Sequence, residues 1–370
     1  MEKPEKPQKL KTRQKFSALD IRGMVGDLSS QLVGTKVHNI YDAFSRTYIF
    51  KFSKSGAKVN LIMESGVRFH TIETFPDKND KPNGFAMKLR KHLKGLFFES
   101  VEQIGVERVV RFKFVGADVN NLDYTFYIVL ELYAKGNIVL LDGKNTVLAL
   151  LRSHKFDEEH RTALKEIYPM HLAAQYYFQD LADIEARFDA LPDATTLTHA
   201  QLISKLVPCA HQALADWQLS RAGLSPAAKF IASAKPALLE AAQATLDCFD
   251  PAKPLEAGGF IYSAKGAAKA FEFSPVRLGS AAPIWSGVEE RATAGFDECV
   301  RLFFAQFAQA DDEAAQDEKI EREAMKKFNK IQEDQQKRLA AIREEVELST
   351  LRARAVEQHS VELTALFNVA

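Results

Sequence analysis

The sequence predicts an α+β protein with three parts: an antiparallel β-rich domain, a helical module and a long helix. Strand-like runs follow one another between residues 36 and 152 without crossover helices, which favours antiparallel sheets in a sandwich or partly closed barrel. Residues 160–250 are rich in alanine and have the apolar spacing of helices. Residues 311–370 contain no glycine or proline and alternate charges of both signs, which is typical of half a coiled coil.

The β-rich part opens with a predicted helix over 17–32, where Ser17 and Asp20 have the pattern of a capping box. A second helix, 84–95, interrupts the strands. The predicted strands are 36–42, 46–52, 58–64, 67–72, 107–114, 124–133, 137–142 and 146–152.

The helical module is predicted to contain a hairpin of two helices. The first helix ends at Pro208, the second ends at Gly223 in the position of a C-cap, and a third helix begins at about residue 227. After this module, two strands flank Lys265-Gly266 as in a hairpin. A helix then carries Val300, Phe303, Phe304 and Phe307 on one side.

The predicted long helix follows from residue 311. Its apolar residues recur at steps of three, four or multiples of these: Ile320, Ala324, Phe328, Ile331, Leu339, Ile342 and Val346. A coiled-coil arm needs a partner helix, so we expect the sequence to be a truncated fragment.

Composition excludes several classes of function. The 370 residues carry 49 Lys+Arg and 49 Asp+Glu, so a basic surface must be local. Three cysteines lie far apart and the histidines do not pair at ligand spacing, so we expect no disulfide framework, no metal and no cofactor. The sequence contains no run of 18 apolar residues, so it predicts no membrane span. Residues 1–15 are charged, with no apolar stretch behind them, and predict a disordered tail.

The helix at 84–95 is the most informative local feature. At 100° per residue its apolar residues form a buried stripe, and Lys88, Arg90, Lys91 and Lys94 lie on the opposite arc. Residues 88–113 hold seven Lys/Arg and three Glu, a net charge of 7 − 3 = +4. This face is either a solvated helix surface or a platform for RNA phosphates. Arg68, His70 and Arg111 on neighbouring strands are further candidate phosphate contacts.

Three residues are candidates for specific polar roles: Asp20, Glu107 and Arg108. From the residues alone each has a structural alternative. Asp20 caps its helix through Ser17, and Glu107 with Arg108 forms a surface pair at a strand end. We found no Gly-rich phosphate loop and no hydrolase or metalloprotease motif.

Five blocks of sequence resemble the NFACT-N domain of the NFACT family. These blocks, in order, are "FSALDIRGMVGDLSSQLVGTKVHNIYD", "ESGVRFHTIE", "GFAMKLRKHLKG", "GVERVVRFKF" and "ELYAKGNIVLLD". The resemblance runs from about Phe16 to about Val346. Bacterial members of this family were first described as fibronectin-binding proteins.

The resemblance implies an architecture. NFACT-N resembles the N-terminal domain of formamidopyrimidine-type glycosylases, followed by a helix-hairpin-helix module and a coiled-coil arm. The implied division is a tail at 1–15, a first NFACT-N part at 16–178, a helix-hairpin-helix module at 179–252, a return segment at 253–309 and a truncated arm at 310–370.

The resemblance also implies a function in ribosome-associated quality control, and it implies a binder with no enzymatic activity. Members bind the large ribosomal subunit and its RNA, recognise peptidyl-tRNA, recruit charged tRNA such as alanyl-tRNA for C-terminal tailing, and stabilise a Listerin-type ubiquitin ligase. By resemblance, Asp20, Glu107 and Arg108 serve tRNA recruitment. The implied location is cytoplasmic, with the nucleus as an additional compartment and no membrane partner.

Two departures and two alternatives accompany this reading. The family pair is usually Asp-Arg, whereas this chain has Glu107-Arg108, and Cys209-Ala210-His211 replaces a Gly-Pro turn. One alternative is a protein–protein scaffold that uses the coiled coil without RNA contact. The other is a glycosylase-like lyase, which the fold analogy suggests but which lacks the N-terminal Pro-Glu of those enzymes.

Overall fold

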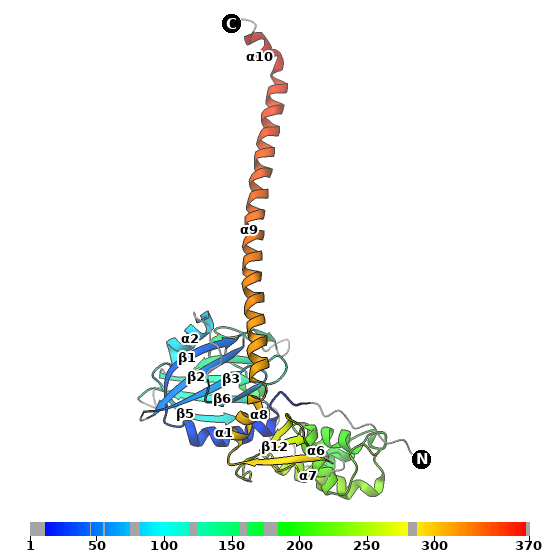
Figure 1. Ribbon diagram of the computed structural model, residues 1–370. Coiled ribbons are helices and arrows are strands. Elements are labelled where there is room, and N and C mark those ends of the chain that lie inside the picture. The colour runs from blue at the N-terminus through cyan, green and yellow to red at the C-terminus, as the bar shows by residue number, and fades with distance from the viewer. Residues whose placement is uncertain are drawn as a thin grey trace. The chain divides into compact units, whose positions relative to one another are not determined.

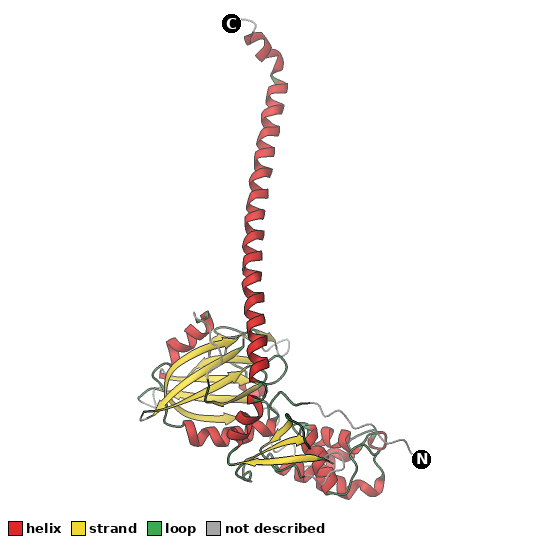
Figure 2. Ribbon diagram, in the orientation of Figure 1, coloured by secondary structure: helices red, strands yellow, loops and turns green. Residues whose placement is uncertain are grey.

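The computed structural model describes residues 12–44, 46–54, 56–74, 82–117, 124–155, 161–173, 184–279 and 287–367. The chain divides into two compact units, Met1–Ala308 and Gln309–Ala370, and each is described separately. Figure 1 shows the elements, and Figure 2 shows the division of the first unit into strand-rich and helix-rich parts.

Helix α1 (Ala18–Leu32) begins as the sequence predicts. Ser17 is the N-cap and accepts a hydrogen bond from the Asp20 backbone N–H, while the Asp20 side chain accepts one from the Ser17 backbone. Its apolar stripe, including Ile21, Met24 and Leu28, is fully buried in the main core.

A nine-stranded antiparallel sheet forms the body of the first unit, with strand order β4-β3-β2-β1-β5-β6-β7-β8-β9. The strands are β1 (Lys36–Phe44), β2 (Thr47–Lys54), β3 (Ala57–Glu64), β4 (Arg68–Ile72), β5 (Phe97–Gln103), β6 (Val109–Val115), β7 (Thr125–Glu131), β8 (Asn137–Asp142) and β9 (Val147–Leu150). The predicted antiparallel sheet is therefore confirmed, and its core is rich in phenylalanine.

The sequence did not reveal β5. Its outward Glu99 and Glu102 make it look too polar for a strand, but they pair with Lys113 and Arg111 of the adjacent β6. Cross-strand ion pairs of this kind stabilise a half-buried strand. They also neutralise part of the local positive charge that the sequence shows.

Helix α2 (Gly84–Leu93) has Asn83 as its N-cap, whose side chain accepts from the Ala86 N–H at 2.7 Å. Leu89 and Leu93 are fully buried, as the periodicity predicts. The helix ends before residue 95 because Gly95 has φ +89°, a left-handed conformation that favours glycine.

The helical module contains α3 (Met170–Ala173), α4 (Ile184–Asp189), α5 (His199–Leu206), α6 (Gln212–Arg221) and α7 (Lys235–Asp247). Gly223 ends α6 with φ +74°, as predicted. The predicted start of the third helix near residue 227 is wrong. Lys229 bridges Thr198, and the Phe230 N–H donates to the Leu197 carbonyl. These two residues therefore pair with the segment before α5, and a 3₁₀ turn (Ala232–Ala234) leads into α7.

The return segment forms a three-stranded sheet and a helix: β12 (Gly259–Ala264), β13 (Ala270–Ser274), β14 (Val288–Thr293) and α8 (Phe296–Ala305). The predicted hairpin at Lys265-Gly266 is confirmed, with Gly266 at φ +75°. The sequence did not reveal β14, because half of its residues are charged and exposed. A small two-stranded sheet, β10 (His154–Lys155) with β11 (Arg161–Thr162), completes the elements.

Residues 12–15 correct the expected tail at 1–15. The Arg13 backbone N–H donates to the Phe271 carbonyl at 2.8 Å, and its side chain is largely buried. Burial beside two carboxylates fixes this segment against the return sheet. The remainder of the expected tail, 1–11, lies outside the described residues.

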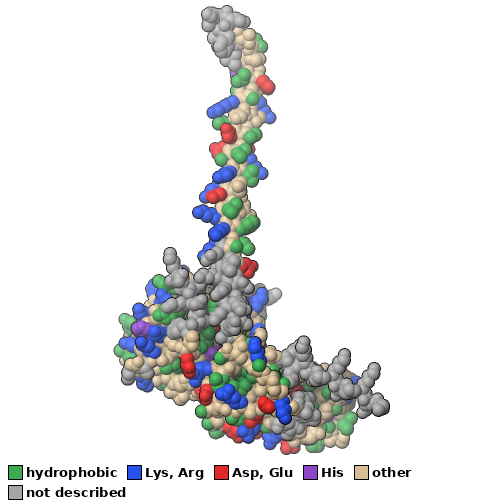
Figure 3. All heavy atoms as spheres, in the orientation of Figure 1, with side chains coloured by type: hydrophobic (Ala, Val, Ile, Leu, Met, Phe, Trp, Pro, Cys, Tyr) green, Lys and Arg blue, Asp and Glu red, His purple; other side chains and the backbone are tan. Residues whose placement is uncertain are grey.

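The second unit is helical, with α9 (Ala308–Gln358), which spans 51 residues, and α10 (Ser360–Phe367). Charged and hydrophobic side chains alternate over the part of the helix whose side chains are described (Figure 3). More than half of each side chain is exposed at Met325, Phe328, Ile331, Leu339, Ile342 and Val346. The side chain of Ile320, another member of the predicted apolar series, lies outside the described residues.

Within the described ranges, none of the helices combines the length and apolarity that crossing a bilayer requires. Nor do those ranges contain a cluster of three or more His, Cys, Asp or Glu side chains arranged to hold a metal ion.

Candidate functional site

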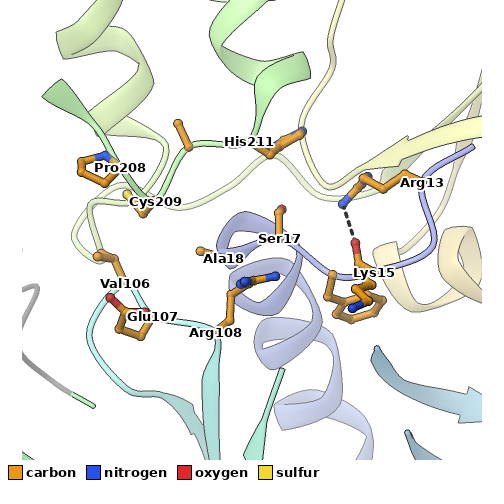
Figure 4. A pocket seen from close by; sticks show the side chains of 12 residues that line it. Arg13, Lys15, Ser17, Ala18, Val106, Glu107, Arg108, Pro208, Cys209 and His211 are labelled. Atoms are coloured by element: carbon orange, nitrogen blue, oxygen red, sulfur yellow. Dashed lines mark hydrogen bonds between the residues drawn. The ribbon is translucent and has the colours of Figure 1, made fainter. Parts of the chain in front are cut away.

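A pocket of about 420 Å³ lies where three segments distant in sequence meet. One wall is the start of α1, the second is the turn between β5 and β6, and the third is the turn between α5 and α6. Figure 4 shows Arg108 extending toward Ser17 and Ala18, with Pro208 and Cys209 across the pocket. The lining residues are Arg13, Lys15, Phe16, Ser17, Ala18, Val106, Glu107, Arg108, Pro208, Cys209, Ala210 and His211.

Glu107 and Arg108 lie in the turn before β6 rather than inside a strand. The Glu107 N–H donates to the Ile104 carbonyl at 3.2 Å, and the Arg108 carbonyl accepts from the Leu132 N–H at 2.8 Å. Burial raises the pKa of the Glu107 carboxyl, while the Arg108 backbone N–H and charge oppose this shift. Within the described residues, the Arg108 guanidinium has no hydrogen bond or ion pair, so it is available to a ligand.

Asp20 does not line the pocket, because its side chain is fully buried. One carboxylate oxygen accepts from the Ser17 N–H at 2.6 Å and from the Ser17 hydroxyl at 2.7 Å. The same carboxylate forms an ion pair with Arg13. Asp20 therefore holds Ser17, a residue of the pocket wall, and does not itself line the pocket.

Arg13 is a site residue that sequence reasoning missed. Its guanidinium donates to the carboxylates of Asp20 and Glu272, to the Phe273 carbonyl and, at 3.3 Å, to the Lys15 carbonyl. It also lies 3.9 Å from the centre of the Phe273 ring. Although burial lowers the pKa of Arg13, the two carboxylates raise it by more. No local pattern distinguishes this arginine from the other cations of the basic N-terminal stretch.

The α5–α6 turn supplies two weakly reactive groups. Burial raises the pKa of the Cys209 thiol to about 12, so the thiol stays protonated and is a poor nucleophile. Burial, and then the charge of Arg13, lower the pKa of His211 to about 4. Its ring nitrogens are buried with no hydrogen-bond partner among the described residues, so the neutral imidazole serves as packing against the Arg13 cluster.

A second candidate surface is formed by the α2 lysines, Lys88, Lys91 and Lys94. All three are exposed, and their ammonium groups have no ion pair with the described residues. Arg90, which the sequence placed with them, differs. Its Nε donates to the Ile40 carbonyl at 2.6 Å, and its guanidinium lies 5.4 Å from the Tyr41 ring centre. Among the described residues, the basic face therefore has three cations without an ion pair rather than four.

Two of the other predicted phosphate contacts are wrong, because they are built into the interior. His70 is 4% exposed and stacks on Phe304, with ring centres 5.7 Å apart. Arg68 donates to Glu64 at 3.0 Å and lies 4.1 Å from the centre of the Phe304 ring. Arg111 remains half-exposed, but Glu102 neutralises it.

The burial of His70 predicts a pH-dependent stability difference. Burial, and next Arg68, lower the pKa of His70 to about 3. Its stability contribution is therefore complete above the unfolded pKa of about 6.5 and is lost as pH falls from that value toward 3. Relative to His70→Gln, the wild type should lose about 2 kcal/mol of unfolding free energy between pH 7 and pH 5.

Urea unfolding of both proteins at pH 7, 6 and 5 measures this difference. Other buried groups titrate in both proteins, so their contributions to the unfolding free energy cancel in the comparison. Parallel pH curves for wild type and variant would show that His70 is accessible and protonates in the folded state.

The pocket and the α2 lysines lie at opposite ends of β5. Lys94 precedes the first residue of this strand, and Gln103, its last residue, precedes the pocket turn. Seven residues at about 3.3 Å each separate the two regions by roughly 20 Å. They can therefore contact different segments of a large ligand.

The fold and site define a β-rich domain with an attached helical module and a pocket at their junction. The chain belongs to the NFACT family, because the family model of the NFACT N-terminal and middle domains matches residues 17–357. The family resemblance seen in the sequence is thereby confirmed.

Curated relatives are ribosome quality control proteins by name. The "Ribosome quality control complex subunit NEMF homolog" of Drosophila melanogaster is 44% identical over 168 residues, 45% of this chain and 16% of the relative. "Ribosome quality control complex subunit NEMF" of Mus musculus is 29% identical over 368 residues, 94% of this chain and 33% of the relative. The chain thus spans at most about a third of the length of these relatives.

Two solved structures share the fold. The fibrinogen-binding protein of Staphylococcus aureus has a TM-score of 0.55 and 17% identity, covering 78% of this chain and 98% of that one. The N-terminal part of the fibronectin/fibrinogen-binding protein of Streptococcus suis has a TM-score of 0.55 and 15% identity, covering 79% and 100%. At these identities the likeness concerns the fold alone.

Proposed function

We propose that this chain is a non-catalytic RNA-binding factor of ribosome quality control, with tRNA held at the pocket and RNA phosphates at the α2 lysines. The observation that carries the proposal is the Arg108 guanidinium, which has no ion pair among the described residues and lies beside the desolvated Glu107 in a pocket that three separate segments build. An arginine without an internal partner is suited to phosphate or base edges. The names of the relatives support ribosome quality control as the process in which this binding takes place.

The proposed partners are the large ribosomal subunit with its RNA, peptidyl-tRNA, and alanyl-tRNA recruited for tailing in the cytoplasm. In this proposal α5 and α6 act as a helix-hairpin-helix module beside the pocket. Helix α9 pairs with another helix as a coiled coil and engages a Listerin-type ligase. The row of half-exposed apolar side chains on α9 supports a partner helix, because such side chains are normally covered.

The chemistry of the pocket supports binding rather than catalysis. The Cys209 thiol is protonated at neutral pH, and the His211 nitrogens are shielded. Glu107 has no activated nucleophile beside it among the lining residues. In this proposal any peptide bond formed during tailing is made by the ribosome.

Co-sedimentation with purified large subunits tests the proposed process. We expect the chain to pellet with subunits that carry peptidyl-tRNA more than with vacant subunits. Equal pelleting with both would show that peptidyl-tRNA is not recognised, and absence of pelleting with either would contradict the ribosomal role of this chain.

Arg108→Ala tests the pocket. Because the guanidinium has no partner among the described residues, its loss should change the unfolding free energy by less than about 0.5 kcal/mol. Loss of a charge-assisted contact should weaken tRNA binding about tenfold or more. Fluorescence anisotropy with labelled tRNA measures the affinity. Arg277→Ala, which removes a surface arginine paired with Glu290, is the control and should leave the affinity unchanged.

A protein–protein scaffold is the second candidate function, favoured by the exposed apolar side chains of α9. Salt dependence separates the two. RNA binding through several phosphates should weaken steeply with salt, whereas an apolar helix contact should be maintained.

A further inference from the structure

Gln103, the last residue of β5, connects two walls of the pocket, the start of α1 and the turn between β5 and β6. Its side-chain Nε2 donates to the Ala18 carbonyl at 3.0 Å and to the Glu107 carbonyl at 2.9 Å. Ala18 is in the first turn of α1, and Glu107 directly precedes Arg108 in the turn before β6. Because both partners are carbonyl oxygens, only the amide nitrogen can occupy this place, and the orientation of the amide is fixed.

We propose that Gln103 is a positioning residue that holds the Glu107–Arg108 turn against the start of α1, so that Arg108 faces the ligand. This inference rests on the proposed RNA-binding function. Gln103 does not line the pocket, so its influence on a ligand passes through the turn. The turn is closed by backbone bonds from the Glu107 N–H to the Ile104 carbonyl and from the Ile104 N–H to the Val109 carbonyl. The Gln103 amide adds the hydrogen bond that ties this turn to α1, and Val106 belongs to the same apolar cluster as Ala18 and Leu19.

The same connection gives Asp20 an indirect role. Asp20 fixes Ser17 and the first turn of α1 through its capping contacts, and Gln103 transmits the position of that turn to Glu107. Hydrogen bonds and the backbone between Ser17 and Ala18 thus connect the buried Arg13–Asp20 pair to Glu107, the residue before Arg108. Asp20 and Arg108 therefore act on one site although Asp20 does not line it.

Gln103→Met tests the proposal, because methionine keeps the volume and flexibility of glutamine and removes both donors. We expect tRNA affinity to fall about three- to tenfold, the range expected for lost hydrogen bonds that hold a contact residue. The tRNA affinity of Gln103→Glu should be lower still, because a carboxylate then faces two carbonyl oxygens. Gln218→Met is the matched control: it removes an amide donor to the Ala244 carbonyl inside the helical module and should leave the affinity unchanged.

A double-mutant cycle separates positioning from general destabilisation. In an Arg108→Ala background, Gln103→Met should cause no further loss of affinity, because Gln103 acts through Arg108. Full additivity of the two losses would overturn the inference. If Arg108→Ala itself leaves tRNA affinity unchanged, the proposed function of the pocket fails.

Hydrogen exchange provides a readout that does not depend on tRNA. In Gln103→Met, backbone amides of residues 104–108 should exchange at least about tenfold faster, whereas those of α2 should be unaffected. Unchanged exchange in the turn would overturn the positioning role even if tRNA does not bind. Faster exchange everywhere would show a merely structural role and would equally overturn it.

Discussion

Arg13→Ala is expected to lower the free energy of unfolding by about 3–5 kcal/mol, because it leaves buried carboxylates without their counter-charge. Asp20 is fully buried and Glu272 is 8% exposed, and both accept from the Arg13 guanidinium. The substitution also removes the stacking on Phe273. Equilibrium urea unfolding followed by circular dichroism measures the effect.

Two controls make the Arg13 result specific. Lys15→Ala removes a nearby exposed cation and should change stability by less than about 0.5 kcal/mol. Combining Arg13→Met with Asp20→Asn and Glu272→Gln should recover part of the loss, because no unpaired charge then remains buried. A loss below about 1 kcal/mol for Arg13→Ala would show that the buried cluster does not form in solution.

Reversing the α2 lysines to glutamate is expected to weaken RNA binding about 10- to 100-fold without unfolding the chain. The three side chains are exposed and have no ion pair among the described residues. If they neutralise phosphates, the slope of log affinity against log salt should fall by about 2 to 3 in magnitude. Anisotropy titrations with tRNA or ribosomal RNA fragments at several salt concentrations measure both quantities.

A matched triple variant controls for net charge. Lys229, Lys265 and Arg291 are also exposed, and their reversal to glutamate changes the net charge by the same amount. This control variant should retain most of the affinity and the salt slope. Equal loss in both triple variants would show that total charge, and not the α2 surface, governs the binding.

The sequence predicted those elements whose signals are local. The capping box at Ser17 and Asp20 fixed the start of α1, and the apolar stripe of α2 identified its buried face. Strands β5 and β14 were not predicted because charged side chains interrupt the apolar alternation in both. The start of the third helix was placed too early because Lys229 and Phe230 pair with the segment before α5 despite a helical composition.

The site was partly predictable for the same reason. Glu107, Arg108 and the three α2 lysines were found from adjacency and helical spacing, which are properties of the sequence. The sequence suggested His70 as a phosphate contact, but α8 covers it, with Phe304 against its ring. The contacts of Arg13 and Gln103 join segments 85 to 260 residues apart, and such pairings follow only from the folded chain.

Site-directed photo-cross-linking tests the central claim most directly. A benzophenone side chain at position 15, on the pocket, is compared with one at position 229, outside it, in complexes of the chain with large subunits carrying peptidyl-tRNA. We predict tRNA cross-links from position 15 and few from position 229. Cross-links to tRNA from position 229 alone, or equal yields from both positions, would contradict a pocket that holds tRNA.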